Sequence, residues 1–364
     1  MESHEYYMKR TLELAKKGWG RTNPNPLVGA VIVKNGEIIA EGWHDVLGGD
    51  HAEVAAFKNA KESVKGSTMY VNLEPCSHFG RTPPCARAII DRGVSNVVIS
   101  MCDPNPKVSG NGIRMLKEAG ICVYTGVLES EAARLNEIFI KYITKKKPFV
   151  IMKTAMTLDG KTASFSGDSK WITGEDSREF VHVLRDRVSS IMVGINTVLA
   201  DDPSLTTRLP FKECKDPVRI IADSKGRIPL NCKVINSSSP AGVILATAKE
   251  LDKDREEKLK DKNVRIISTS DASGRVDLSK LMGELYLMEI DSVLIEGGGT
   301  LNASALEAGI VDKVFTFIAP KIIGGCNALT PVEGAGRKLM SEAYKLRDVS
   351  VTKFKDDILV EGYI

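Results

Sequence analysis

Three short segments in the first half of the 364-residue chain carry a histidine, a glutamate and two cysteines: His51-Ala52-Glu53, Pro75-Cys76 and Pro84-Cys85. His51, Cys76 and Cys85 can supply three ligands to Zn²⁺ and leave the fourth tetrahedral position to water. A bound zinc ion lowers the pKa of that water to about 7. Glu53 can then take a proton from the water and deliver it to a departing amine. The segments predict a zinc hydrolytic site with Glu53 as its catalytic acid and base.

The same residues also admit a structural zinc site, or cysteines that only pack in a core. A closed structural site takes four ligands and needs no neighbouring acid, whereas only three good ligands occur here and Glu53 lies beside the first. Seven cysteines is an odd count and nothing in the sequence indicates secretion, so no disulfide between Cys76 and Cys85 is expected. The catalytic interpretation is therefore favoured.

The spacing of the two cysteines narrows the prediction. The usual signature of zinc nucleobase deaminases closes with Pro-Cys-x-x-Cys, but eight residues separate Cys76 from Cys85. The segment from Pro75 to Cys85 has every fixed position of Pro-Cys-x-His-x-Gly-Arg-Thr-Pro-Pro-Cys, and it resembles the deaminases of riboflavin biosynthesis. Over nearly its whole length the chain resembles the bifunctional family that fuses a diaminohydroxyphosphoribosylaminopyrimidine deaminase to a 5-amino-6-(5-phosphoribosylamino)uracil reductase.

Length and composition agree with a two-domain globular protein. Hydrophobic residues make up 43% of the chain and charged residues 27%, which is ordinary for globular proteins. The net charge of +3 provides no broad basic field for nucleic acid. The sequence contains no run of 18 apolar residues and opens with a polar segment, so we expect neither a membrane span nor a signal peptide. A cytoplasmic, homo-oligomeric enzyme is expected.

The first half predicts a mixed sheet covered by helices. Strands at residues 27–33 and 37–43 form a hairpin around Asn35-Gly36. Asp50 is expected to cap a helix whose first turn holds His51 and Glu53, and a single helix is expected over residues 129–142. The order of elements is that of the cytidine-deaminase-like fold. We place this domain at residues 1–145 and interpret the lysines of residues 145–147 as a solvated linker rather than a phosphate-binding patch.

The second half, residues 148–364, alternates strands and helices and predicts an α/β domain with a largely parallel sheet. Residues 196–208 are expected to form a loop. A strand expected over residues 292–295 is followed by Glu296-Gly297-Gly298-Gly299 and then by a helix over residues 300–308. This arrangement can hold phosphate on backbone amides and a helix N-terminus. It is not the Gly-x-Gly-x-x-Gly fingerprint, and the glycines could equally form only a tight turn.

The resemblance implies a dihydrofolate-reductase-like fold for this half, with NADPH and a phosphorylated ribosylaminopyrimidine as its ligands. By position, the residues that would face the cofactor are Ala155, Trp171, Thr197, Asp201, Ser224, Gly297, Gly298 and Gly299. Those that would face the substrate are Ser169, Arg185, Leu205, Arg208 and Glu296. Lys153 and Asp201 are expected nearest the hydride-transfer centre. The alternatives are surface salt bridges for the two arginines, a core position for Trp171 and a turn role for Asp201.

In the deaminase site, Asn25 and His78 are expected to contact the pyrimidine, whereas His44 has no assigned role and His182 carries no signal. The resemblance implies zinc-dependent deamination of 2,5-diamino-6-ribosylamino-4(3H)-pyrimidinone 5′-phosphate. Reduction of the ribosyl unit by NADPH to 5-amino-6-ribitylamino-uracil 5′-phosphate follows. One alternative is a base-modifying enzyme with an RNA-binding second half, although aromatic residues make up only 6% of the chain. Another is a deaminase with a non-catalytic regulatory domain.

Overall fold

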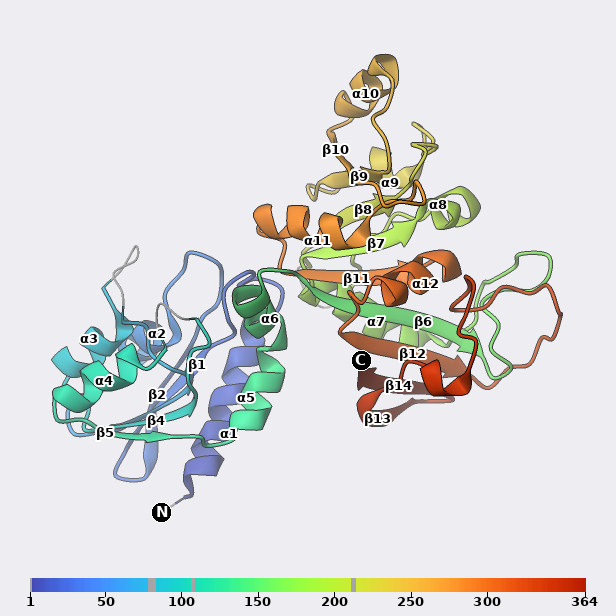
Figure 1. Ribbon diagram of the computed structural model, residues 1–364. Coiled ribbons are helices and arrows are strands. Elements are labelled where there is room, and N and C mark those ends of the chain that lie inside the picture. The colour runs from blue at the N-terminus through green and yellow to red at the C-terminus, as the bar shows by residue number, and fades with distance from the viewer. Residues whose placement is uncertain (1, 78–82, 106–108, 211–213) are drawn as a thin grey trace. The chain divides into compact units, whose positions relative to one another are not determined.

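The computed structural model describes residues 2–77, 83–105, 109–210 and 214–364. The chain forms two compact units, Met1–Lys146 and Lys147–Ile364, which are blue to green and green to red in Figure 1. The division falls inside the lysine-rich segment that the sequence predicts to be a linker. No helix in the described part of the chain is long and apolar enough to cross a membrane.

The first unit is built on a five-stranded sheet of order β2-β1-β3-β4-β5. Its strands are β1 (Gly29–Lys34), β2 (Glu37–Trp43), β3 (Thr68–Leu73), β4 (Asn96–Met101) and β5 (Cys122–Thr125). Strand β1 is antiparallel to β2 and β3, whereas β3, β4 and β5 are parallel. The predicted mixed sheet is confirmed. Because β3 and β4 are parallel, the segments that follow them leave the sheet at the same edge.

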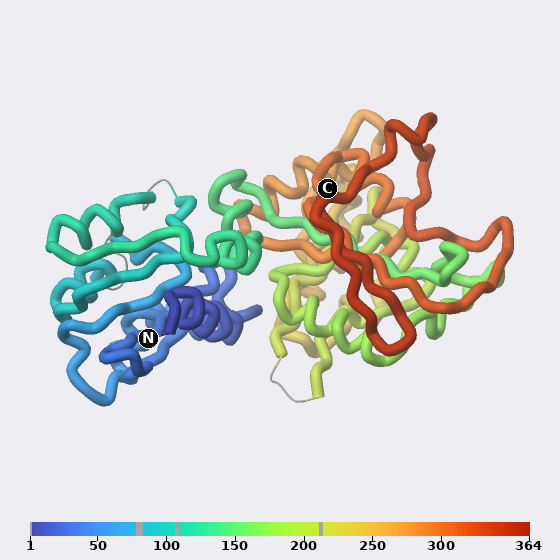
Figure 2. Tube along the Cα trace, turned by 90° about the horizontal axis from the view of Figure 1, so that it is seen from below, coloured from blue at the N-terminus to red at the C-terminus, as the bar shows by residue number. Residues whose placement is uncertain are grey.

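Helices cover both faces of this sheet (Figures 1 and 2). Successive strand residues point to opposite faces: Val97 packs in one cluster and Val98 in another. The Val97 face lies under α2, α3 and α4, and the other under α1 and α5. These helices are α1 (His4–Ala15), α2 (Ala52–Asn59), α3 (Cys85–Asp91), α4 (Asn111–Glu118) and α5 (Glu129–Leu135), and a short 3-10 turn, η1 (Lys16–Gly18), follows α1.

Helix α2 lies directly against β2. A Cβ atom on Gly42 of β2 would lie 2.2 Å from the backbone nitrogen of Ala56, so only glycine permits this approach. The start of α2 differs from the prediction, because His51 itself occupies the N-cap position and Asp50 does not cap the helix. The close packing of α2 on β2 fixes the position of the start of α2, and with it His51 and Glu53, relative to the sheet.

The single helix predicted over residues 129–142 is wrong. Helix α5 ends at Leu135 and α6 (Glu137–Lys145) begins two residues later, with Asn136 in the cap position between them. The buried Asn136 side chain donates from Nδ2 to the Leu27 carbonyl at 3.1 Å and accepts the Leu27 N–H at Oδ1 at 2.8 Å. The amide thus pairs with both backbone groups of a residue 109 positions away, a contact that helical periodicity cannot reveal.

The second unit is built on a nine-stranded sheet of order β10-β9-β8-β7-β11-β6-β12-β14-β13. All pairs from β10 to β12 are parallel, and the last two strands are antiparallel additions at one edge. The predicted largely parallel α/β fold is confirmed. The strands are β6 (Phe149–Thr157), β7 (Ser190–Gly194), β8 (Val218–Ala222), β9 (Val243–Thr247), β10 (Val264–Ser268), β11 (Ser292–Gly297), β12 (Lys313–Ala319), β13 (Arg347–Phe354) and β14 (Asp357–Tyr363).

Helices α11 and α12 pack in one core cluster of this sheet, and α8, α9 and α10 pack in another. The prediction of a loop over residues 196–208 is partly wrong, because residues 195–201 form α8. Ile195 and Val198, one turn apart, are buried against Ile221 and Leu245 of the sheet. The helices are α7 (Glu175–Arg187), α8 (Ile195–Asp201), α9 (Lys233–Asn236), α10 (Lys253–Lys260), α11 (Leu278–Leu287) and α12 (Gly299–Glu307), with a 3-10 turn η2 (Met340–Glu342).

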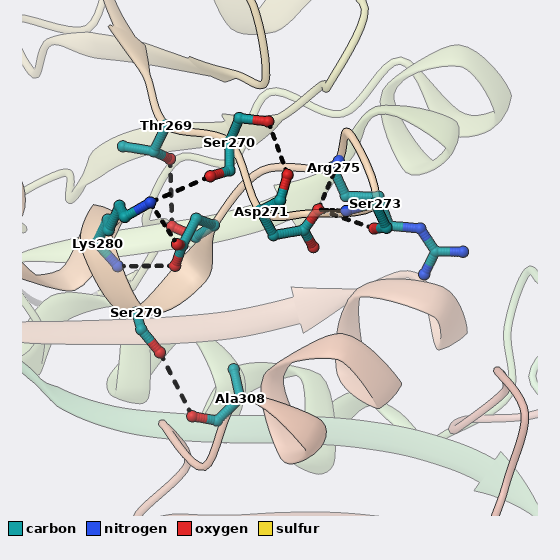
Figure 3. Close-up of polar contacts among 9 residues, drawn as sticks. Thr269, Ser270, Asp271, Ser273, Arg275, Ser279, Lys280 and Ala308 are labelled. Atoms are coloured by element: carbon teal, nitrogen blue, oxygen red, sulfur yellow. Dashed lines mark hydrogen bonds and ion pairs between the residues drawn. The ribbon is translucent and has the colours of Figure 1, made fainter.

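The connection from β10 to α11 is a tight polar turn (Figure 3). The Asp271 carboxylate accepts the backbone N–H groups of Ser273 and Arg275 and the Ser273 hydroxyl, all within 3.0 Å. Asp277 then caps α11 by accepting the Lys280 N–H. These contacts fix the turn that lies beside Ser224, as the Val276 N–H donates to the Ser224 hydroxyl at 3.2 Å.

Candidate active sites

His51, Cys76 and Cys85 come together from three separate elements. His51 is the N-cap residue of α2, Cys76 follows β3, and Cys85 is the first residue of α3. Their ligand atoms all lie within 4.8 Å of one another. His51 Nδ1 lies 3.3 Å from Cys85 Sγ and 3.7 Å from Cys76 Sγ. Tetrahedral zinc holds nitrogen and sulfur donors about 3.5 Å apart, so the three residues fit a zinc ion with one open position.

The two thiols and the imidazole shift one another's pKa values. Hydrogen bonds from Cys85 and His51 lower the pKa of Cys76 to about 4, and the Cys85 N–H donates to Cys76 Sγ at 3.3 Å. The hydrogen bond with Cys76 raises the pKa of Cys85 and that of His51. The group therefore combines a thiolate with protons shared among its members. Such protons are released when a divalent cation binds.

Glu53 lies beside these ligands as the second residue of α2, and it is 3% exposed. Burial raises the pKa of its carboxyl, and the Cys76 thiolate acts in the same direction. A carboxyl group whose pKa is raised can hold and release a proton near neutral pH. The position and environment of Glu53 thus suit a proton carrier.

Asn25 and His44 form a second layer at this site. His44 Nδ1 lies 2.9 Å from the Asp50 carbonyl, which can only accept, so Nδ1 carries the proton. The Asn25 amide then donates from Nδ2 to His44 Nε2 at 3.2 Å, and its Oδ1 accepts no hydrogen bond from the residues that the structure describes. The His44 ring also packs on the His51 ring, with centroids 5.7 Å apart. His44 therefore orients Asn25, whereas His78 lies outside the described residues.

Glu74 is a site residue to which the sequence assigned no role. It directly precedes Pro75-Cys76 and is 3% exposed. Its Oε1 accepts the N–H groups of Gly112 and Ile113, and its Oε2 accepts those of Asp103 and Gly110, at 2.9 to 3.2 Å. One carboxylate thus ties the end of β3 to the segment after β4 and to the start of α4. The sequence signal available for this structural role was the position of Glu74 directly after a predicted strand.

In the second unit, three charged side chains converge at the centre of the sheet. Glu296 of β11 accepts from Arg185 of α7 at 2.6 Å to Nε and 2.8 Å to Nη2. Lys153 Nζ of β6 lies 4.0 Å from Glu296 Oε2. The side chains of Glu296, Lys153 and Arg185 are only 6%, 15% and 14% exposed. The Arg185 pair is therefore not the surface salt bridge of the alternative interpretation.

The environment shifts the pKa values of this triad. Burial lowers the pKa of Lys153, with Arg185 adding to the effect and Glu296 opposing it. Burial opposes ionisation of Glu296, but Arg185 and Lys153 outweigh it and hold the Glu296 pKa below its usual value. A carboxylate and an ammonium group with a lowered pKa therefore lie side by side. That combination suits proton transfer to a substrate.

The glycine turn lies at the C-terminal end of β11. Gly298 has φ of +96°, which a residue with a side chain rarely adopts, and Gly299 begins α12. A Cβ atom on Gly297 would lie 3.1 Å from Thr197 Oγ1 of α8. The turn thus brings together Thr197 and a helix N-terminus, as a phosphate-holding arrangement requires.

The other predicted reductase residues differ in their burial and in the elements on which they lie. Ala155 is two residues from Lys153 on β6, and therefore on the same face of the sheet. Trp171 is 63% exposed and lies under Arg178, 4.7 Å from guanidinium carbon to ring centroid, so it is not a core aromatic. Ser169 lies half-buried in the connection between β6 and α7.

Leu205 and Asp201 differ from each other in burial. The Leu205 side chain is 4% exposed and belongs to a core cluster, which leaves only its backbone to meet a ligand. Asp201 is exposed at the end of α8, and no hydrogen bond or ion pair among the described residues joins it to Lys153 or Glu296. Lys153 thus belongs to the charged triad, and the role of Asp201 stays a prediction.

His182 is a second residue that sequence reasoning missed. It lies one turn before Arg185 on α7, and its Nδ1 lies 3.2 Å from the backbone nitrogen of Arg208. Its spacing of three residues from Arg185, which places both on one helix face, was the available signal.

Comparison with known proteins assigns a family to each of the two units. Residues 1–101 match the cytidine and deoxycytidylate deaminase zinc-binding region, and residues 148–360 match the RibD C-terminal domain. The fold and the motifs thus define a two-domain enzyme that joins a zinc-binding deaminase domain to a reductase domain. The chain belongs to the RibD family of riboflavin biosynthesis proteins, which are bifunctional deaminases and reductases.

The relatives match along nearly their whole length. Riboflavin biosynthesis protein RibD of Actinobacillus pleuropneumoniae is 48% identical, covering 98% of this chain and 94% of its own. The RibD protein of Aquifex aeolicus is 44% identical, covering 99% of this chain and 98% of its own. A similar crystal structure is that of a diaminohydroxyphosphoribosylaminopyrimidine deaminase/5-amino-6-(5-phosphoribosylamino)uracil reductase from Thermotoga maritima, with a TM-score of 0.87. It is 43% identical in sequence, and the match covers 99% of this chain and 98% of the other.

Proposed function

We propose that the first unit hydrolyses the exocyclic 2-amino group of 2,5-diamino-6-ribosylamino-4(3H)-pyrimidinone 5′-phosphate. The second unit then reduces the ribosyl group of the product with NADPH, giving 5-amino-6-ribitylamino-uracil 5′-phosphate. The observation that carries the proposal is the meeting of three zinc-type donors with the buried carboxyl of Glu53. Family membership supplies the substrate class.

In the deaminase reaction, His51, Cys76 and Cys85 are the proposed zinc ligands, and zinc supplies the Lewis acidity that makes water nucleophilic near neutral pH. Glu53 takes a proton from the water that attacks C2 and delivers it to the 2-amino nitrogen, which leaves as ammonia. Asn25 Oδ1, held by His44, accepts a hydrogen bond from the pyrimidine. His78 is proposed as a further pyrimidine contact.

In the reductase reaction, the sugar ring opens when the bond between C1′ and O4′ breaks and O4′ takes a proton. In the opened form C1′ is the carbon of an imine-like group. NADPH supplies the hydride that C1′ receives. Lys153, whose pKa is lowered by burial, is the proposed proton donor, and Glu296 fixes its ammonium group. Arg208, which is exposed, binds the 5′-phosphate because its guanidinium group matches phosphate geometry.

The remaining contacts follow from position. Arg185 is engaged by Glu296 and by the Thr206 carbonyl, so its proposed contribution is to hold these groups toward the substrate. Ser169 and the Leu205 backbone are further substrate contacts. The proposed cofactor contacts are Ala155, Trp171, Thr197, Asp201, Ser224, Gly297, Gly298 and Gly299.

The test uses Glu53→Gln in the full chain. This change keeps the size of the side chain and removes the proton carrier, so ammonia release should fall by about 10²–10⁴-fold while bound zinc is unchanged. NADPH oxidation with the deaminated intermediate should remain at the wild-type rate, which controls for folding. Ammonia release within a few-fold of wild type would remove Glu53 from the mechanism, and no NADPH oxidation by the wild-type chain would remove the reductase assignment.

A further inference from the structure

The segment of residues 206–208 is held at its backbone by three side chains. Arg185 Nη1 donates to the Thr206 carbonyl at 2.9 Å. The Asp216 carboxylate accepts the Thr207 N–H at 2.7 Å, and His182 Nδ1 accepts the Arg208 N–H, with nitrogens 3.2 Å apart. Each of the three residues is therefore fixed through its own peptide group.

Helix α7 provides two of these contacts. His182 and Arg185 are three residues apart and lie on the same side of the helix. The apolar packing of this part of α7 is carried by Val181 and Leu184, which are 8% and 3% exposed, whereas His182 is half-buried. His182 therefore contributes a polar contact rather than core volume.

The contact defines the protonation of His182. Because the Arg208 backbone nitrogen can only donate, Nδ1 must be unprotonated and the ring proton of a neutral His182 lies on Nε2. Burial, together with the Arg185 and Arg208 charges, lowers the His182 pKa to about 4. The ring is thus neutral and able to accept this hydrogen bond throughout the neutral pH range.

The Arg208 side chain extends from this segment and also bonds back to it. Its guanidinium group is exposed, and the hydrogen bond that it makes within the described residues is from Nη1 to Thr206 Oγ1 at 2.8 Å. Both ends of that hydrogen bond belong to the segment that α7 holds. A segment released at the Arg208 nitrogen would allow the guanidinium group to move with it.

We propose that His182 is a positioning residue of the reductase, which accepts the Arg208 N–H and so directs the Arg208 guanidinium group toward the 5′-phosphate of the substrate. The inference rests on the proposed function, because that proposal gives Arg208 its ligand. His182 itself does not touch the reacting atoms, and it acts only through the position of Arg208.

The experiment compares steady-state kinetics of the full-length wild type with those of three variants, with the deaminated phosphorylated intermediate as substrate. His182→Ala removes one hydrogen bond, so KM for the intermediate should rise by about 3–10-fold while kcat and KM for NADPH stay within twofold. His182→Asn places an amide oxygen near the position of Nδ1 and should restore KM. Glu179→Ala, at an exposed position of the same helix, is the control and should have no effect.

A double-mutant cycle tests whether His182 acts through Arg208. In an Arg208→Ala background no guanidinium group remains to be positioned, so His182→Ala should add little to KM. With the intermediate lacking its phosphate, wild type and His182→Ala should have equal KM values. Additive effects, an equal loss with the dephosphorylated compound, or failure of His182→Asn to restore KM would each overturn the proposal. A wild-type chain that reduces no intermediate would instead refute the proposed function.

Discussion

Replacement of Glu74 by glutamine should destabilise the first unit far more than its small chemical change suggests. In the wild type, each carboxylate oxygen accepts two backbone N–H groups. Glutamine keeps one such oxygen and presents an NH₂ group to the other two donors. Two N–H groups, one buried and one partly buried, then lose their acceptor. The cost is about 1–3 kcal/mol for the buried group and about 1 kcal/mol for the other. The expected loss of about 2–4 kcal/mol is a large part of the stability of a typical domain.

The two activities of one chain allow this loss to be located. Deaminase and reductase activities are measured after heating the full-length protein to a series of temperatures. In Glu74→Gln the midpoint for deaminase loss should fall by at least about 6 °C, whereas that for reductase loss should be unchanged. Glu118→Gln, whose ion pair with Arg114 is exposed on α4, should shift neither midpoint by more than about 2 °C.

The result that would refute this reasoning is a Glu74→Gln protein whose deaminase midpoint matches that of Glu118→Gln. The four N–H groups would then find water or other acceptors at no cost. An equal fall in both midpoints would show that the effect is not confined to the first unit.

Four further outcomes are expected. Cys76→Ser should lose bound zinc by elemental analysis and ammonia release with it; full zinc would show that the ligand assignment is wrong. Arg208→Ala should raise KM for the intermediate about 10–100-fold by removing a charge-assisted phosphate contact, and an unchanged KM would contradict its role. A chain divided near Lys147 should yield a deaminase fragment and a separate reductase fragment, and a reductase fragment that is inert until the first fragment is added would refute two independent sites. Folding lowers the His182 pKa from 6.5 to about 4. The contribution of His182 to the free energy of unfolding is therefore full above pH 6.5 and is lost as pH falls toward 4. In denaturant titrations at pH 6.5 and pH 4, the free energy of unfolding should fall less in His182→Asn than in wild type.

The sequence by itself nominated three residues that the structure brings together at the first site, because the information that marks them is local. Zinc chemistry requires particular residue types, and the prolines and strand that flank Cys76 and Cys85 fix where those residues leave the sheet. Short, mostly apolar segments such as β3 and β4, which are buried along nearly their whole length, similarly predicted strands, since a short apolar run is recognised without knowledge of the partner strand.

Tertiary structure alone decided which distant groups meet. Arg185 and Glu296 are 111 residues apart, and the sequence could nominate both as ligand contacts without indicating that they bind each other. Glu74 and His182 act on backbone N–H groups, which every residue possesses, so no residue type marks their partners. The interruption at Asn136 has the same origin, because its side chain binds the backbone of Leu27. Contacts to peptide groups depend on the position of the chain in space, and that position is fixed only when the sheets and helices have packed.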